Sequence, residues 1–169
     1  YRSRGKSKEA IPLYEKALQL RRRVLGADHP ETLRTGSNLA YAYLFVGKAQ
    51  EGVALQEDTL ARRRRALGPE HPDTLVSMSN LGLAFEHMQR LDEARGVLET
   101  TYQMQRRILG EAHTSVLSTA LNLGRVLRAQ SRLDEAVKLI QQAVQTAQAH
   151  GQEKDPLTLT MMNNLGLYH

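Results

Sequence analysis

LGADHPETLRTGSNLA at residues 25–40 returns, little changed, as LGPEHPDTLVSMSNLG at residues 67–82. A third copy, LGEAHTSVLSTALNLG, occupies residues 109–124, and a weaker fourth, GQEKDPLTLTMMNNLG, occupies residues 151–166. The step between copies is 42 residues, as from Asn38 to Asn80 and on to Asn122. A fixed period of this length indicates a protein built by stacking copies of one structural unit.

Each period predicts two helices. The first, helix A, runs from Glu31 to Val46 in the first copy, after Pro30 and before Gly47. The second, helix B, runs from Lys8 to Leu25 and is stopped by Gly26. Helical spacing predicts a buried stripe on each helix. These stripes are Leu33, Leu39, Ala40, Tyr43 and Val46 on helix A, and Ala10, Leu13, Tyr14, Ala17, Leu18, Val24 and Leu25 on helix B.

Two helices alone cannot bury these stripes, so neighbouring hairpins must share them in a stacked array. The predicted array covers residues 1–169, with helix B/helix A units at about 8–47, 50–89, 92–131 and 134–169. Tyr1, Gly5 and Lys6 align with Tyr43, Gly47 and Lys48. Residues 1–7 are therefore expected to be the end of a truncated helix A and its turn. We expect a fragment of a longer array, with ends that favour self-association.

Composition excludes several classes of protein. The 169 residues are 41% hydrophobic and 24% charged, as in soluble globular proteins, and they contain no Cys. No apolar run approaches the roughly 20 residues that span a membrane. The net charge is +5, but residues 1–8 contain four basic residues and no acidic one. The nearly neutral remainder disfavours nucleic-acid binding, which needs many cationic contacts. A cytoplasmic location fits.

Catalytic and metal-binding motifs are not found. His29, His71 and His113 recur at the repeat step, which places each a whole hairpin from the next. Zinc ligands must converge on one ion, so these histidines are expected to serve helix starts instead. We expect no enzyme activity, no cofactor and no metal.

Arginines cluster late in helix B, as Arg21–Arg23, Arg62–Arg65 and Arg106–Arg107. One interpretation is that they are solvated and complement the helix dipole. The other is a basic ladder along one side of the array, which could hold an acidic peptide or a phosphate backbone. Both interpretations stay open at this point.

The pattern Asn-Leu-(Ala/Gly)-x-x-(Tyr/Phe), seen in NLAYAY and NLGLAF, resembles the tetratricopeptide repeat, as do the helix-ending Gly and the Glu-Ala that opens helix B. The segment ALQLRRRVLGADHPETL at residues 17–33 is similar to the longer, kinesin light chain variety. The resemblance implies an all-α, right-handed superhelical solenoid of antiparallel helix pairs. It also implies a protein-interaction scaffold, whose partner it does not identify.

In arrays of this family, helix A lines a concave groove, and asparagines there hold the backbone of a bound peptide. An amide offers both a donor and an acceptor, so it can pair with both sides of a peptide unit. The alternative, that these asparagines only pack, stays open. The candidate peptide-binding residues are Arg34, Ser37, Asn38, Tyr41, Ser79, Asn80, Leu83, Asn122, Arg125, Arg128 and Asn164. The three arginines in this set favour an acidic or mixed peptide.

The expected function is thus a scaffold that binds a peptide segment of a partner protein. One alternative is a structural spacer, self-association or sensor region of a larger signalling protein, such as a nucleotide-binding regulator. A second alternative is nucleic-acid binding through the arginine clusters.

Overall fold

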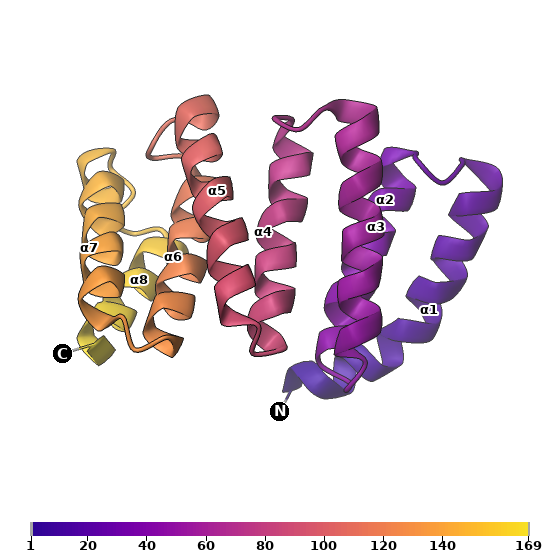
Figure 1. The fold of residues 1–169 in the computed structure, drawn as a ribbon, viewed down its shortest axis with the longest axis horizontal. Helices are drawn as coiled ribbons and strands as arrows, with labels where there is room; N and C mark the ends of the chain where they lie inside the picture. Colours follow the sequence, from indigo (N-terminus) through magenta and orange to yellow (C-terminus); the bar gives the residue numbers. More distant parts are fainter. Residues whose placement is uncertain (1, 169) are drawn as a thin grey trace. The chain divides into compact units, whose positions relative to one another are not determined.

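The described residues are entirely helical apart from the connectors. The computed structural model describes the backbone of residues 2–168 and the side chains of residues 10–166. This backbone contains eight α-helices and no strand: α1 (Arg2–Val24), α2 (Pro30–Leu44), α3 (Ala49–Leu67), α4 (Pro72–His87), α5 (Leu91–Leu109), α6 (Thr114–Ala129), α7 (Leu133–Ala149) and α8 (Pro156–Tyr168) (Figure 1). The predicted all-α class is therefore confirmed. Within the described residues, no helix combines the length and apolar character needed to cross a membrane.

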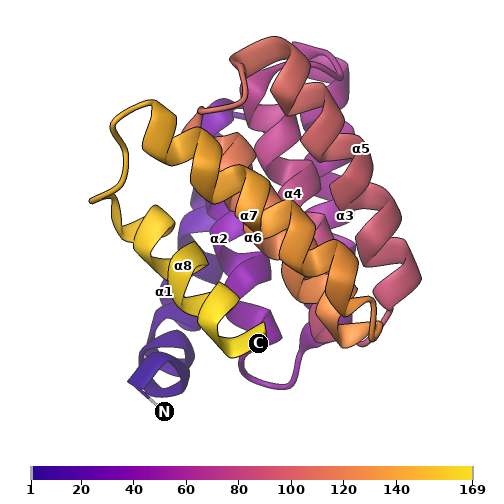
Figure 2. The same ribbon diagram turned by 90° about the vertical axis from the view of Figure 1, so that its left-hand side faces the viewer.

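The helices form two compact units, residues 1–90 with α1–α4 and residues 91–169 with α5–α8. Odd-numbered helices are helices B and even-numbered helices are helices A. In each unit every helix packs against the next, and the two helices A also touch, α2 with α4 and α6 with α8. Figure 2 shows α8 lying alongside α7 in the second unit. The helices A α2 and α6 therefore each pack between the helix B before them and the helix B after them.

The recurring histidines start the helices A, as the sequence predicts. His29, His71 and His113 are the N-cap residues of α2, α4 and α6. In each, the ring Nδ1 accepts a hydrogen bond from the backbone N–H two residues ahead, at 3.2 Å, 3.2 Å and 3.1 Å. An N-cap acceptor satisfies one of the backbone donors that a helix start leaves without a partner. Helix capping thus accounts for the spacing of these histidines.

The turn from helix A to helix B needs a left-handed residue in each of the first three copies. Gly47 supplies it after α2 with φ +83°, whereas Gln89 and Ser131 adopt φ +59° and +60° at the same repeat position. Residues with a side chain rarely adopt a positive φ, whereas glycine adopts it without steric cost. The packing of the hairpins therefore holds the turn shape even where the local sequence disfavours it.

The core follows the predicted stripe on helix A. Leu33, Leu39 and Ala40 are buried in α2, and their equivalents Leu75, Leu81 and Gly82 are buried in α4. In the second unit, Leu98, Ile140 and Met161 are fully enclosed. Apolar burial of this kind is the main favourable term in folding.

The stripe predicted for the first helix B is wrong in part. Leu13 and Val24 are 71% and 72% exposed, and Leu25 is exposed as well. Ile11, which the prediction left out, is buried with Leu18. Helix α1 packs only on α2 among the described helices, so one side of its apolar surface stays uncovered. A helix B inside an array has neighbours on both sides, which is what the prediction assumed.

The turn predicted within residues 1–7 is also wrong, because α1 begins at Arg2 and continues through Gly5, Lys6 and Ser7. The physical reason is that one glycine inside a helix costs only about 1 kcal/mol relative to alanine, so Gly5 does not by itself end the helix. The alignment of Tyr1 lies outside the described residues.

Gly52 allows α3 to approach α2 closely. A Cβ at this position would lie 2.7 Å from the backbone oxygen of Ala40 and 3.2 Å from Leu44. The three other copies carry alanine at this position, as in Ala94 and Ala136. The contact between α2 and α3 is therefore tighter than the repeat pattern alone predicts.

Gly52→Ala is expected to destabilise the protein by about 1–3 kcal/mol, because a backbone oxygen cannot move aside as a flexible side chain can. Gly96→Ala is the matched control, since nothing lies within 4 Å of its Cβ position. This control is expected to stabilise by about 0.4–1 kcal/mol by restricting the unfolded chain. Urea unfolding midpoints measure both, and equal effects of the two substitutions would contradict the close approach.

Candidate peptide-binding surface

A cavity of about 440 Å³ lies in the first unit, at the surface of α1, α2 and α4. Its lining contains four of the residues that the sequence predicts for peptide binding. They are Ser37, Asn38 and Tyr41 from α2 and Asn80 from α4. Ala10, Tyr14 and Ala42 complete the lining. Because α2 and α4 pack together, residues a whole repeat apart in sequence contribute to one cavity.

The cavity presents amides and hydroxyls on an apolar base. Asn38 is exposed and Asn80 is half-buried, so both amides lie where an incoming backbone could reach them. Ser37 is only 7% exposed, and its Oγ has no hydrogen-bond partner among the described residues. A hydroxyl this enclosed presents little surface to a ligand, so the amides of Asn38 and Asn80 are polar groups of the helices A that a peptide can reach.

Aromatic rings extend this surface along α2 and onto the end of α4. The ring of Tyr41, which is 51% exposed, lies 4.9 Å from that of Phe45 in an edge-to-face arrangement. Phe45 in turn lies 5.0 Å from the ring of His87 on α4. Rings in contact offer a rigid apolar surface beside the polar cavity, a combination that suits recognition of both a peptide backbone and its side chains.

The other predicted residues lie elsewhere. In the first unit, Arg34 is exposed and pairs with Glu31 at 2.7 Å, Ser79 is buried and Leu83 is half-buried. Four further residues belong to the second unit, where Asn122 is buried, Arg125 and Asn164 are half-buried and Arg128 is exposed. Buried Ser79 and Asn122 present little surface to a ligand. The prediction was made from helical spacing, which does not distinguish a residue at a helix–helix contact from one beside it.

Ala10 and Tyr14 line this surface, although helical spacing predicts both of them for the core. Tyr14 is only half-buried, since it packs against the core cluster that includes Leu39 and Ala42 of α2 and also lines the cavity. The signal that could have identified it is its size, since the equivalent positions in later copies hold Gln56, Leu98 and Ile140. An aromatic with a polar tip favours a boundary between core and solvent.

Comparison with known proteins settles the family. Tetratricopeptide repeats match residues 1–51, 35–107, 77–149 and 115–169, which together cover the chain. The chain belongs to the tetratricopeptide repeat family. No curated protein matches it.

Solved structures show which variety of tetratricopeptide repeat this is. Two crystal structures of a Podosopora anserina protein, described as of kinesin light chain type with nearly identical repeats, are each 30% identical, with TM-scores of 0.81 and 0.79. The matches cover 97% of this chain and 77% and 78% of those chains. BtubC (BKLC) from P. vanneervenii is 23% identical with a TM-score of 0.79, over 97% of this chain and 65% of that one, and shows the fold alone. These repeats are therefore kinesin light chain-like.

The arginine clusters of this tetratricopeptide repeat protein are not all solvated. Arg21 donates from Nη1 to the backbone oxygen of Glu31 at 3.1 Å and to Thr35 Oγ1 at 2.5 Å. One repeat later, Arg63 donates from Nη1 to the backbone oxygen of Asp73 at 3.1 Å and to Ser77 Oγ at 2.6 Å. The same arginine in two copies therefore connects the end of helix B to the start of the next helix A.

Arg63 is the more enclosed of the two. It is buried, and desolvation lowers the pKa of its guanidinium, which the nearby Asp73 raises in part. The equivalent positions in the third and fourth copies, Gln105 and Ala147, are buried as well. This repeat position thus faces inward in every copy from the second to the fourth, whatever residue occupies it.

Other arginines of the clusters pair with acids. Arg62 bonds Asp58 at 2.9 Å and Asp28 at 3.0 Å, and Arg22 lies 3.4 Å from the same Asp58. A basic ladder that binds phosphates would need these cations to face solvent without carboxylate partners. Several arginines of the clusters are therefore explained by contacts within the protein rather than by phosphate binding.

Among the described residues, no group of three or more His, Asp or Glu side chains is placed to hold a metal ion.

Proposed function

We propose that this tetratricopeptide repeat chain is a cytoplasmic scaffold module that binds an extended peptide segment of a partner protein against α2 and α4. The observation that carries the proposal is the cavity lined jointly by Ser37, Asn38, Tyr41 and Asn80. Asn38 and Asn80 come from successive copies of the repeat, so their amides form a short row across neighbouring helices A.

Recognition would combine two kinds of contact. The amides of Asn38 and Asn80 would pair with the C=O and N–H groups of the peptide backbone, independent of its sequence. The rings of Tyr41 and Phe45 would pack on one apolar side chain of the peptide. This contact would select peptides that carry an apolar residue at that position.

A preference for acidic peptides is the finer part of the proposal. Within the unit that contains the cavity it rests on Arg34, which is exposed. Arg34 already pairs with Glu31, so the expected preference is small. Exposed charges of this kind steer association more than they add affinity. The preference is therefore expected to weaken as salt is added.

Fluorescence titration of a labelled peptide library against the chain tests the proposal. The double variant Asn38→Leu/Asn80→Leu is expected to weaken the best peptide by about 10–100-fold, since each lost hydrogen bond costs about 0.5–1.5 kcal/mol. Asn163→Leu is the matched control, because Asn163 is an exposed helix A asparagine outside the cavity lining. It should leave the affinity unchanged.

Comparing acidic with neutral peptides at two salt concentrations separates the two parts of the proposal. Equal affinities for acidic and neutral peptides at low salt would contradict the acidic preference but not peptide binding against α2 and α4. Peptide binding that survives the double variant, or equal losses in the double variant and the control, would contradict the groove itself.

Self-association is a second candidate, favoured by exposed apolar side chains on the first and last helices. Leu13, Leu20 and Val24 are exposed on α1, and Leu159 and Met162 are exposed on α8. Apolar patches of this kind mark association surfaces. An apparent mass that rises with protein concentration, together with no bound peptide in the titration, would favour this function over peptide binding.

A further inference from the structure

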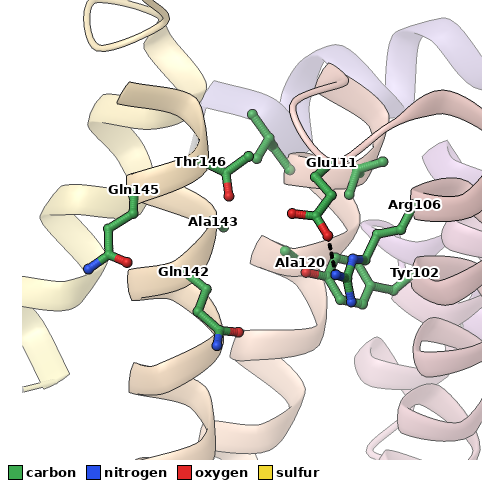
Figure 3. A pocket seen from close by; sticks show the side chains of 10 residues that line it. Tyr102, Arg106, Glu111, Ala120, Gln142, Ala143, Gln145 and Thr146 are labelled. Atoms are coloured by element: carbon green, nitrogen blue, oxygen red, sulfur yellow. Dashed lines mark hydrogen bonds and ion pairs between the residues drawn. The ribbon is translucent and has the colours of Figure 1, made fainter. Parts of the chain in front are cut away.

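A second cavity lies in the other unit, between the helices B α5 and α7, with α6 as its base. Its volume is about 240 Å³. Figure 3 shows Glu111, Arg106 and Tyr102 on one side and Gln142, Gln145 and Thr146 on the other. The base is apolar and consists of Val116, Leu117, Ala120 and Ala143. The cavity therefore has an apolar base, one ion pair and four uncharged side chains with polar groups.

The first unit fills the equivalent position with a side chain of its own. Two repeat steps earlier, the counterpart of Thr146 is Arg62 and that of Gln142 is Asp58. Arg62 extends from α3, bonds Asp58 at 2.9 Å and reaches Asp28, in the connector between α1 and α2, at 3.0 Å. A guanidinium thus bridges a helix B and the connector that follows the preceding helix B.

The second unit keeps the acidic end of this bridge and lacks the guanidinium. Glu111 lies in the connector between α5 and α6, beside the counterpart of Asp28. Thr146 is too short to cross from α7 to that connector. The cavity, lined by Thr146 at one end and Glu111 at the other, follows the path that Arg62 takes in the first unit.

We propose that this cavity binds an arginine side chain of a partner protein, which would take the position that Arg62 takes in the first unit. Its guanidinium would pair with Glu111 and donate to the side-chain oxygens of Gln142 and Thr146. Its methylenes would lie on Val116 and Leu117. A planar fork of donors can meet several acceptors at once, which the compact ammonium of lysine does less well.

Glu111 already pairs with Arg106, and that pairing raises the pKa of Arg106. One carboxylate can serve two guanidinium groups in this fold, since Asp58 lies within ion-pair distance of both Arg22 and Arg62. Arg22 is the repeat counterpart of Arg106. The proposed complex would likewise place two guanidinium groups on one carboxylate, but that carboxylate would be Glu111 in the connector, whereas in the first unit it is Asp58 on α3, the counterpart of Gln142.

Glu111 is the carboxylate on which the proposal depends. An adjoining cavity along α5 and α7 shares Tyr102, Arg106 and Gln142 and adds Glu99, Glu135 and Lys138. Glu99 pairs with Arg95 at 3.2 Å and Glu135 pairs with Arg132 at 2.6 Å, so these two carboxylates are already neutralised. The site lies among α5, α6 and α7 and does not depend on the peptide cavity of the first unit.

The test is an NMR titration of isotope-labelled protein with the capped tripeptide acetyl-Gly-Arg-Gly-amide. The side-chain NH₂ resonances of Gln142 and Gln145 should shift in a saturable way. The analogue with citrulline, which has the same shape without the charge, should bind at least about tenfold more weakly, because charge-assisted bonds are roughly twice as strong as neutral ones.

Two variants should remove the response. Glu111→Gln removes the carboxylate, and Glu153→Gln is its matched control, because Glu153 holds the same repeat position one copy later. Thr146→Arg should fill the cavity from within, abolish the shifts and raise Tm by about 2–4 °C through the added bridge. Glu111→Gln leaves the size of the side chain unchanged, so it tests the site even if Thr146→Arg does not fold.

The proposal is overturned by a linear, non-saturating response to tens of millimolar tripeptide. It is equally overturned by equal shifts with the citrulline analogue, or by shifts that persist in Glu111→Gln. A loss of response in Glu153→Gln as large as in Glu111→Gln would also contradict it, because that loss would show a general effect of surface charge.

Discussion

Arg63→Ala is expected to lower the free energy of unfolding by about 2–4 kcal/mol, because it removes the donor from one buried and one partly buried acceptor. These acceptors are the backbone oxygen of Asp73 and the hydroxyl of Ser77. A buried acceptor left without a partner costs about 1–3 kcal/mol. The loss of the packed methylenes of the side chain adds to this cost. Chemical denaturation followed by circular dichroism measures the change.

The neighbouring arginine provides the control. Arg64 is exposed on the same helix, and Arg64→Ala is expected to change stability by less than about 0.5 kcal/mol. Arg63→Gln should lie between the two, because glutamine occupies the buried counterpart in the third copy, Gln105. If Arg63→Ala and Arg64→Ala had the same small effect, the inward position of Arg63 would not contribute to the connection between α3 and α4.

Leu75→Ala is expected to destabilise the protein by about 2–5 kcal/mol, the usual range for core leucines that leave a cavity. Leu75 is 0% exposed and is one of the buried residues of α4. The substitution leaves a cavity, which the tightly packed neighbours of Leu75 can fill only in part. The shift of the unfolding midpoint in urea measures the effect.

Val76→Ala is the control for this substitution, one residue further along the same helix. Val76 is 40% exposed, so little apolar contact is lost, and alanine has the higher helix propensity. A change within about 0.5 kcal/mol is expected. A large loss in Val76→Ala with little change in Leu75→Ala would mean that α4 presents the opposite face to the core.

Helices and their starts could be predicted from the sequence because local physics determines them. The repeat step placed His29, His71 and His113 one hairpin apart, and capping is a contact between near neighbours in the chain. The exposed face of α1 could not be predicted in this way. Burial of Leu13 depends on a neighbouring helix that the structure does not place there, and periodicity alone assumes that such a neighbour exists.

The candidate site was predictable only in part for a similar reason. Spacing identified one face of helix A, and four residues of that face line the cavity. It could not show that Asn122 is buried, because that depends on how closely α6 approaches its neighbours. Spacing also does not distinguish Arg21, Arg22 and Arg23, because packing alone decides which arginine points inward.

The central claim is that α2 and α4 form a peptide-binding surface. NMR chemical-shift mapping with the tightest peptide from the library tests it most directly. The account predicts that the side-chain amides of Asn38 and Asn80 shift on binding, while that of Asn163 does not. Shifts that leave Asn38 and Asn80 unchanged and fall on other helices would contradict it.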